Sequence, residues 1–189
     1  MEKIPVGVSA RHMHLSAADL ATLFGEGYEL TVYKELRQPD QFAAQERVTL
    51  IGPKRSLENV RILGPVRSHS QVEISLTDAV YSGIDAPISF SGELEGASDV
   101  EVIGPRGRLQ LKGVVIAAGR HIHASPAEAA ALGISEGDLV RVRAEGSRAL
   151  IFERVLVRVD ESYRLEYHID TDEANAAGLK TGDLVTLVR

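Results

Sequence analysis

The chain has 189 residues, of which 44% are hydrophobic, and it contains no cysteine. This length allows one domain or two small ones with a real core. Disulfides, thiolate nucleophiles and cysteine-type zinc fingers are excluded, so a metal must be held by histidine, carboxylate or water. The net charge of −6 argues against a wide nucleic-acid surface. No apolar run is long enough for a membrane helix and the N-terminus lacks signal-peptide features, so we expect a cytoplasmic protein.

The first predicted element is a strand over residues 5–14 that carries His12 and His14 at its end. Side chains two apart on a strand point to the same face, so these two imidazoles aim together. Two imidazoles on one face supply two of the three protein ligands of a catalytic zinc site. A short helix follows, with Ser16 as its N-cap and Gly25 as its terminator.

Residues 25–47 show no clear period, and a stretch of this length in a compact protein is often a functional lid. We therefore treat residues 25–47 as a lid-like insertion. From residue 48 to 106, short β-branched runs alternate with Gly-Pro pairs, which predicts closed or sandwiched antiparallel sheets. Further β-branched runs between residues 139 and 188 predict the strands of a second barrel.

The pattern Arg-His-x-His-x-Ser occurs twice, at residues 11–16 and 120–125, each time before an alanine-rich helix. The repeat extends to four helix starts, and each N-cap lies two residues after a potential metal ligand at a strand end. These four ligands are His14, Glu73, His123 and His168. Glu73 and His168 therefore occupy equivalent positions in the two halves.

Each half then supplies three potential ligands: His12, His14 and Glu73 in the first, and His121, His123 and His168 in the second. Two-His-one-Glu and three-His sets with an open fourth position are both known forms of catalytic zinc. A lone His-x-His pair on a strand is commonly a surface or half-buried pair that binds no metal. The six residues could instead form a polar core whose hydrogen bonds are satisfied. Duplication with matching third ligands favours metal binding, and only His69 lies outside the pattern.

From residue 6 to about residue 188, the sequence resembles the PduL-type phosphotransacylases (phosphate propanoyltransferases). The motifs that carry the resemblance are residues 9–16, 38–43, 71–75, 120–123 and 168–175. The resemblance implies a mainly β fold with short α-helices, in which an internal duplication forms two β-barrel domains that exchange the N-terminal strand. The implied domains are residues 11–118, the central barrel, and residues 1–10 plus 119–189, the second barrel.

The resemblance also implies one zinc ion on each three-ligand group, about two per chain. The implied reaction interconverts acyl-CoA (acetyl-CoA or propanoyl-CoA) and phosphate with acyl phosphate and CoA. Arg67 would be the phosphate-binding arginine. Further active-site polar residues implied by the resemblance are Ser9, Lys34, Arg61, Gln41 and Asn175. Ser91 and Ala118 are implied as part of the CoA surface.

Two departures from the family pattern affect these expectations. His69 stands where family members carry a non-ligand polar residue, so we do not count it as a metal ligand. Many relatives begin with an amphipathic helix that targets them into bacterial microcompartments, whereas this chain starts directly at the first strand. We therefore expect a free cytoplasmic enzyme that works beside an acetate or propionate kinase, as a homo-oligomer without a membrane or nucleic-acid partner.

The simplest mechanism is direct transfer in a ternary complex, because a chain without cysteine cannot form a cysteinyl acyl-enzyme. Zinc and Arg67 would orient phosphate, and zinc could stabilise the oxyanion or the departing thiolate. Two alternatives stay open. A zinc hydrolase would ionise water at the open site. A structural two-metal barrel module would use the ions only for folding, although structural sites usually have four protein ligands.

Overall fold

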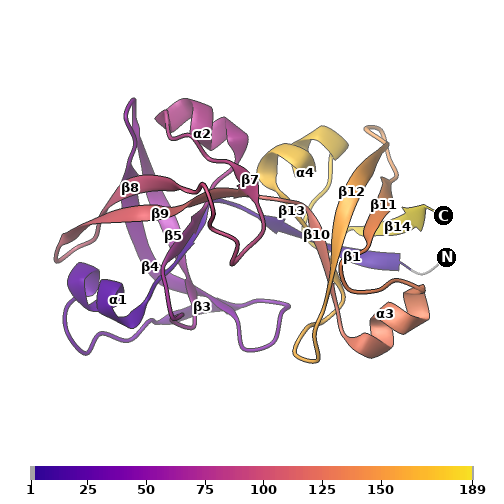
Figure 1. Ribbon diagram of the computed structural model, residues 1–189, viewed down its shortest axis with the longest axis horizontal. Helices are drawn as coiled ribbons and strands as arrows, with labels where there is room; N and C mark the ends of the chain where they lie inside the picture. Colours follow the sequence, from indigo (N-terminus) through magenta and orange to yellow (C-terminus); the bar gives the residue numbers. More distant parts are fainter. Residues whose placement is uncertain (1–2, 189) are drawn as a thin grey trace. The chain divides into compact units, whose positions relative to one another are not determined.

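The computed structural model describes residues 3–188, and strands dominate this part of the chain (Figure 1). It contains two compact units, one formed by Arg11–Leu36 and Asp40–Ala118, the other by Met1–Ala10, Arg37–Pro39 and Gly119–Arg189. Each unit has its own buried hydrophobic cluster and its own closed barrel. Among the described residues, no helix is long and apolar enough to cross a membrane.

Six strands close the barrel of the unit that begins at Arg11, in the order β4, β5, β2, β6, β9 and β8, with β8 pairing back to β4. Their bounds are β2 His12–His14, β4 Phe42–Ile51, β5 Ser56–Gly64, β6 Gln71–Glu73, β8 Ser98–Ile103 and β9 Arg108–Ala118. The remaining elements of this unit are β3 Val32–Glu35, β7 Ile88–Ser89, α1 Ala17–Phe24 and α2 Leu76–Ser82. Alternate residues such as Leu50, Ile62 and Val102 point inward and fill the barrel.

The other barrel has the strand order β1, β13, β10, β12, β11 and β14, and it closes where β14 pairs with β1. Its elements are β1 Lys3–Ser9, β10 His121–Ala124, α3 Pro126–Leu132, β11 Leu139–Ala144, β12 Leu150–Val159, β13 Glu166–Asp170, α4 Thr171–Ala177 and β14 Leu184–Val188. The strand from the beginning of the chain thus completes a barrel made otherwise from its C-terminal part (Figure 1). The predicted fold, mainly β with two barrels and an exchanged N-terminal strand, is confirmed.

The expectation of one strand over residues 5–14 is wrong, because Ala10 and Arg11 separate β1 from β2. β1 pairs with β13 and β14, whereas β2 pairs with β5 and β6. The two strands therefore satisfy their backbone hydrogen bonds in different barrels, and this pairing ends β1 before Ala10.

The four predicted helix starts are confirmed. The N-caps Ser16, Ser75, Ser125 and Asp170 each accept a hydrogen bond from the backbone N–H three residues further on. The strands before these helices repeat as well: β2 is antiparallel to β6 and parallel to β5, and β10 is antiparallel to β13 and parallel to β12. The same pairing around the same capped helices supports an internal duplication.

The segment 25–47 contains β3 and the first residues of β4. Residues 42–47 are part of the barrel wall, because β4 pairs with β5 from Phe42 onward. Gln38, from the middle of the segment, is buried and belongs to the other unit, where its side-chain amide donates to the carbonyl of Arg164 (2.9 Å).

Candidate metal centres

The first candidate metal centre lies where β2 pairs with β6. His12 and His14 lie on β2, and Glu73 is the register partner of His12 on β6. All three are buried, and one potential ligand atom of each lies within 4.8 Å of the others. His12 Nε2 is 3.4 Å from Glu73 Oε2. The alternation of side chains on one short strand, together with one cross-strand pair, is enough to gather these three groups.

His14 is held in the form that binds a metal. Its Nδ1 is buried and has no hydrogen-bond partner among the described residues. Burial lowers the pKa of His14 well below its ordinary value, and the charges of His12 and Arg67 lower this pKa further. The ring is therefore neutral near pH 7 and keeps a lone pair for coordination.

A hydrogen-bond chain holds the Glu73 carboxylate and reaches Arg67. Gln71 Nε2 donates to Glu73 Oε1 (2.6 Å) and to Ser91 Oγ (2.9 Å), and Gln71 Oε1 accepts from the Gly92 N–H (2.9 Å). Arg67 donates to the same Ser91 hydroxyl at 3.3 Å. Hydrogen bonds of this kind orient ligating carboxylates in metal sites. This chain of hydrogen bonds also places the guanidinium of Arg67, which is predicted to bind phosphate, beside the first group of ligands.

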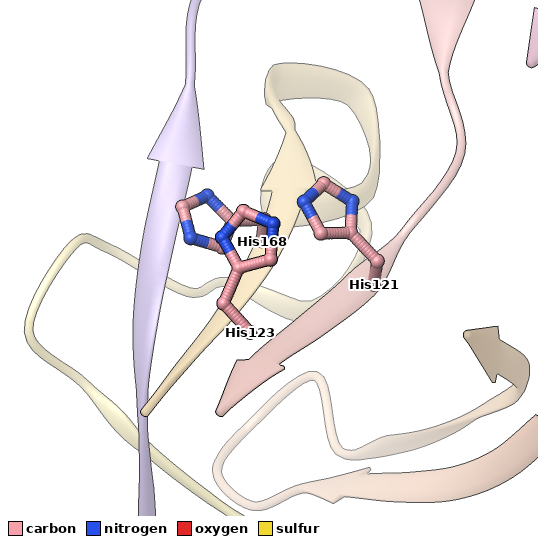
Figure 2. Close-up of side chains that lie close together, drawn as sticks. All are labelled: His121, His123 and His168. Atoms are coloured by element: carbon pink, nitrogen blue, oxygen red, sulfur yellow. The ribbon is translucent and has the colours of Figure 1, made fainter. Parts of the chain in front are cut away.

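The second candidate metal centre repeats this arrangement with three histidines. Figure 2 shows their rings gathered together, with His121 and His123 on β10 and His168 on the neighbouring β13. His168 is the register partner of His121, and one nitrogen of each ring lies within 4.8 Å of the others. His121 Nδ1 contacts the carbonyl oxygen of Gly119 at 2.9 Å. Because a carbonyl only accepts, this contact places the proton on Nδ1 and leaves Nε2 to coordinate.

His123 gives the strongest indication that a metal belongs here. Both of its ring nitrogens are buried without a hydrogen-bond partner among the described residues. Burial and the neighbouring His121 and His168 lower its pKa to about 2. Leaving a buried polar atom unpaired costs about 1–3 kcal/mol, and coordination would remove this penalty for one nitrogen. The ring is also stacked on Tyr163, with centroids 4.0 Å apart.

The donor atoms of both groups fit zinc. Imidazole nitrogens and a carboxylate oxygen are ordinary zinc ligands. Each group has three protein ligands, so a fourth position is left for water or a substrate atom. His69 is exposed and lies outside both groups.

The other residues predicted for the active site are more dispersed along the chain. Arg61 is the register partner of His12 on β5, and its guanidinium donates to the carbonyl of Ala44 and lies over the ring of Tyr33. Ser9 ends β1 as the register partner of Asp170. Lys34 on β3 and Asn175 on α4 are exposed, Gln41 is half-buried just before β4, and Ala118 ends β9. The roles of these residues stay predictions.

Two ion pairs beside the candidate centres are missed by reasoning from the sequence. Arg11 lies 2.6 Å from Asp78, and Arg120 lies 2.6 Å from Glu173. In each half the arginine directly precedes the first histidine, and the acid is the third residue of the helix after the third ligand. The repeat itself was the signal that could have revealed them, because both partners recur at matching positions. Each pair ties the strand of two ligands to the helix that follows the third.

We expect Glu173→Gln to lower the free energy of unfolding by about 1.5–3 kcal/mol, the usual contribution of a hydrogen bond to a charged group. Glu173 is partly buried, and burial raises its pKa, whereas the hydrogen bond and the charge of Arg120 lower this pKa and so favour the ionised carboxylate. Urea denaturation of the metal-loaded protein measures the change. The control is Glu101→Gln, whose partner Arg108 is 72% exposed, with an expected loss of at most about 1 kcal/mol. Equal losses in the two variants would contradict a special role for Glu173.

Comparison with known proteins gives consistent matches. A family model described as phosphate propanoyltransferase matches residues 5–180. Among similar proteins, the phosphate propanoyltransferase of Thermotoga maritima is 58% identical over 186 residues, which covers 98% of this chain and 89% of that protein. The proteins of the same name from Lachnoclostridium phytofermentans and Klebsiella pneumoniae are 51% and 55% identical, over 98% and 93% of this chain and 87% and 83% of their own lengths. The chain belongs to the phosphate propanoyltransferase family.

Proposed function

We propose that this protein transfers an acyl group between CoA and phosphate, converting acyl-CoA and phosphate into acyl phosphate and CoA, with a zinc ion at each group of ligands. The observation that supports this most strongly is the duplicated three-ligand centre in a member of an acyltransferase family. Two such centres offer open positions for substrate atoms, which a site built only for folding would not need.

Arg67 supports a phosphate site at the first centre. Its charge acts on His14, and its guanidinium donates to Ser91, which shares Gln71 with the ligand Glu73. A planar guanidinium can donate two hydrogen bonds to one phosphate and stays charged at every working pH. Phosphate held in this way would approach a thioester in a fixed orientation, which lowers the entropic part of the barrier.

In the proposed step a phosphate oxygen attacks the thioester carbonyl carbon, a C–O bond forms, the C–S bond breaks, and CoA leaves as its thiolate. When bound, zinc would supply Lewis-acid stabilisation of the developing negative charge. The protein groups orient phosphate through Arg67 and keep the ligands in place through Gln71. The chain has no cysteine, so the acyl group does not pass through a cysteinyl acyl-enzyme.

The remaining polar residues named from the family pattern have supporting roles in this proposal. Arg61 lies next to His12 across the β2–β5 pair, where its charge would face the same substrate anion. Ser9, Lys34, Gln41 and Asn175 would contact the substrates, with Ala118 and Ser91 on the CoA side. The acyl phosphate would serve an acetate or propionate kinase, and we propose that the enzyme acts in the cytoplasm as a homo-oligomer.

The proposal is tested by mixing the purified protein with acyl-CoA and following free thiol, with and without phosphate. We expect thiol release that requires phosphate. Both acetyl-CoA and propanoyl-CoA should be substrates, and their catalytic efficiencies should differ by no more than about 10- to 200-fold, since one methylene discriminates only this much. Thiol release without phosphate would instead indicate a hydrolase. No release with either acyl-CoA, from protein loaded with zinc, would indicate a structural metal module.

A further inference from the structure

A buried carboxylate lies against the second candidate metal centre and has no part in the function proposed above. Glu166 is two residues before His168 on β13, so both side chains point to the same face of the strand. Only 5% of Glu166 is exposed, and its Oε2 is 3.2 Å from His168 Nε2. A carboxylate so deeply buried is costly unless positive charge or hydrogen bonds compensate it.

The protein is built to hold this carboxylate in place. Gln38 Nε2 donates to Glu166 Oε2 at 2.9 Å, and the same amide is fixed to the Arg164 backbone by a bond from its nitrogen (2.9 Å) and one to its oxygen (3.2 Å). Gly7 on β1 is the register partner of His168, and a Cβ atom at Gly7 would lie 2.7 Å from Glu166 Oε1. A side chain at residue 7 would therefore displace the carboxylate.

The first centre contains the same arrangement of side chains, an amide bound to a carboxylate that lies beside an imidazole. There an amide, Gln71, donates to a carboxylate, Glu73, whose other oxygen lies 3.4 Å from the imidazole of His12. In the second centre an amide, Gln38, donates to Glu166, which lies beside His168. Glu73 and Glu166 occupy different positions of the repeat. Each centre nevertheless contains one buried carboxylate that accepts a hydrogen bond from a glutamine amide.

The charges of the two groups of ligands indicate a role for Glu166. A divalent cation on three neutral imidazoles keeps its full charge in a buried site, whereas the carboxylate ligand of the first centre removes part of that charge. We infer that Glu166 is a positioning residue of the second metal centre, which compensates the charge of the bound cation and fixes the orientation of His168. This inference rests on the metal sites of the proposed function but not on acyl transfer.

The test measures metal affinity directly. In a His12→Ala background, which disables the first centre, Co²⁺ is titrated into the metal-free protein against a chelator of known affinity, and the visible absorption of bound Co²⁺ is recorded. We expect Glu166→Gln, which keeps the size of the side chain and removes its charge, to weaken Co²⁺ binding by about 10- to 100-fold, as for other residues that support metal ligands. The absorption bands should also shift.

Two further variants keep the result specific. Glu161→Gln removes the same charge from an exposed position of the same unit and should leave Co²⁺ affinity unchanged. Glu166→Asp keeps the charge and should bind Co²⁺ more tightly than Glu166→Gln. Circular dichroism before each titration identifies any variant that does not fold. If Glu166→Gln does not fold, the Co²⁺ affinity of Glu166→Asp is compared with that of the parent, and equal affinities would overturn the inference.

The outcomes separate this inference from the proposed function. Equal Co²⁺ affinity and spectra for Glu166→Gln and Glu161→Gln would overturn the role of Glu166, whether or not the parent protein transfers acyl groups. Failure of the parent to bind Co²⁺ at the second centre would overturn it as well. Weakened binding in Glu166→Gln would support it even if no phosphate-dependent thiol release were found.

Discussion

Replacement of His123 by alanine should reduce the zinc content from about two ions per chain to about one and abolish most acyl transfer. His123 is the residue whose two ring nitrogens are both buried without a partner among the described residues, and a bound cation would satisfy the nitrogen that faces His121 and His168. We expect activity to fall by more than about 100-fold, beyond the effect of losing a residue that merely supports a ligand. Elemental analysis gives the zinc content, and phosphate-dependent thiol release gives the activity.

The matched control is His69→Ala. His69 is exposed and lies outside both groups of ligands, so its loss should change neither zinc content nor activity. Zinc content that stays at the parent level in His123→Ala would contradict the second centre. A parent protein that carries almost no zinc and is insensitive to chelators would contradict the two-metal proposal as a whole.

Replacement of Arg67 by alanine should preserve the fold and both zinc ions but lower catalytic efficiency by about 10- to 150-fold. This corresponds to the loss of one charge-assisted contact of roughly 1.5–3 kcal/mol. The loss should appear in the dependence on phosphate concentration, or in kcat if the contact tightens in the transition state. Steady-state kinetics at varied phosphate, together with zinc analysis, measure both effects.

Two variants serve as controls for Arg67→Ala. Arg108→Ala removes an equal charge from a largely exposed arginine of the same unit and should leave the kinetics unchanged. Arg67→Lys keeps the charge but cannot donate two hydrogen bonds in one plane, so an intermediate activity is expected. Parent-like phosphate kinetics in Arg67→Ala would remove Arg67 from the phosphate site, and loss of zinc would show that it acts by supporting the first centre.

The features that could be predicted from the sequence are those that depend on short spacings. His12 and His14 share a face because side chains alternate along a strand, and the cap at Ser16 forms because its hydroxyl reaches the N–H of Asp19. Both rules need only residues that are neighbours in the chain. The repeat extended this local information to Glu73 and His168, which lie far along the sequence from the histidines they join.

The division of the chain between barrels could not be obtained from local pattern. The sequence suggests one strand over residues 5–14, and the pairing partners of β1 and β2 separate them at Ala10 and Arg11. The family resemblance supplied the exchanged strand, but spacing and composition did not. Backbone pairing over such distances is decided by which edges remain open in each barrel, which is a property of the whole fold.

The sequence by itself determined which residues could bind metal, since the residue types and the two-residue spacing of the histidines are both visible in it. Tertiary structure alone decided what surrounds them. Glu166 has no motif of its own, and its place beside His168 depends on Gln38, distant in sequence, and on the missing side chain of Gly7. Such contacts join three separate segments through strand register and burial, and a shift of one residue in any of them would turn the side chains to the opposite face.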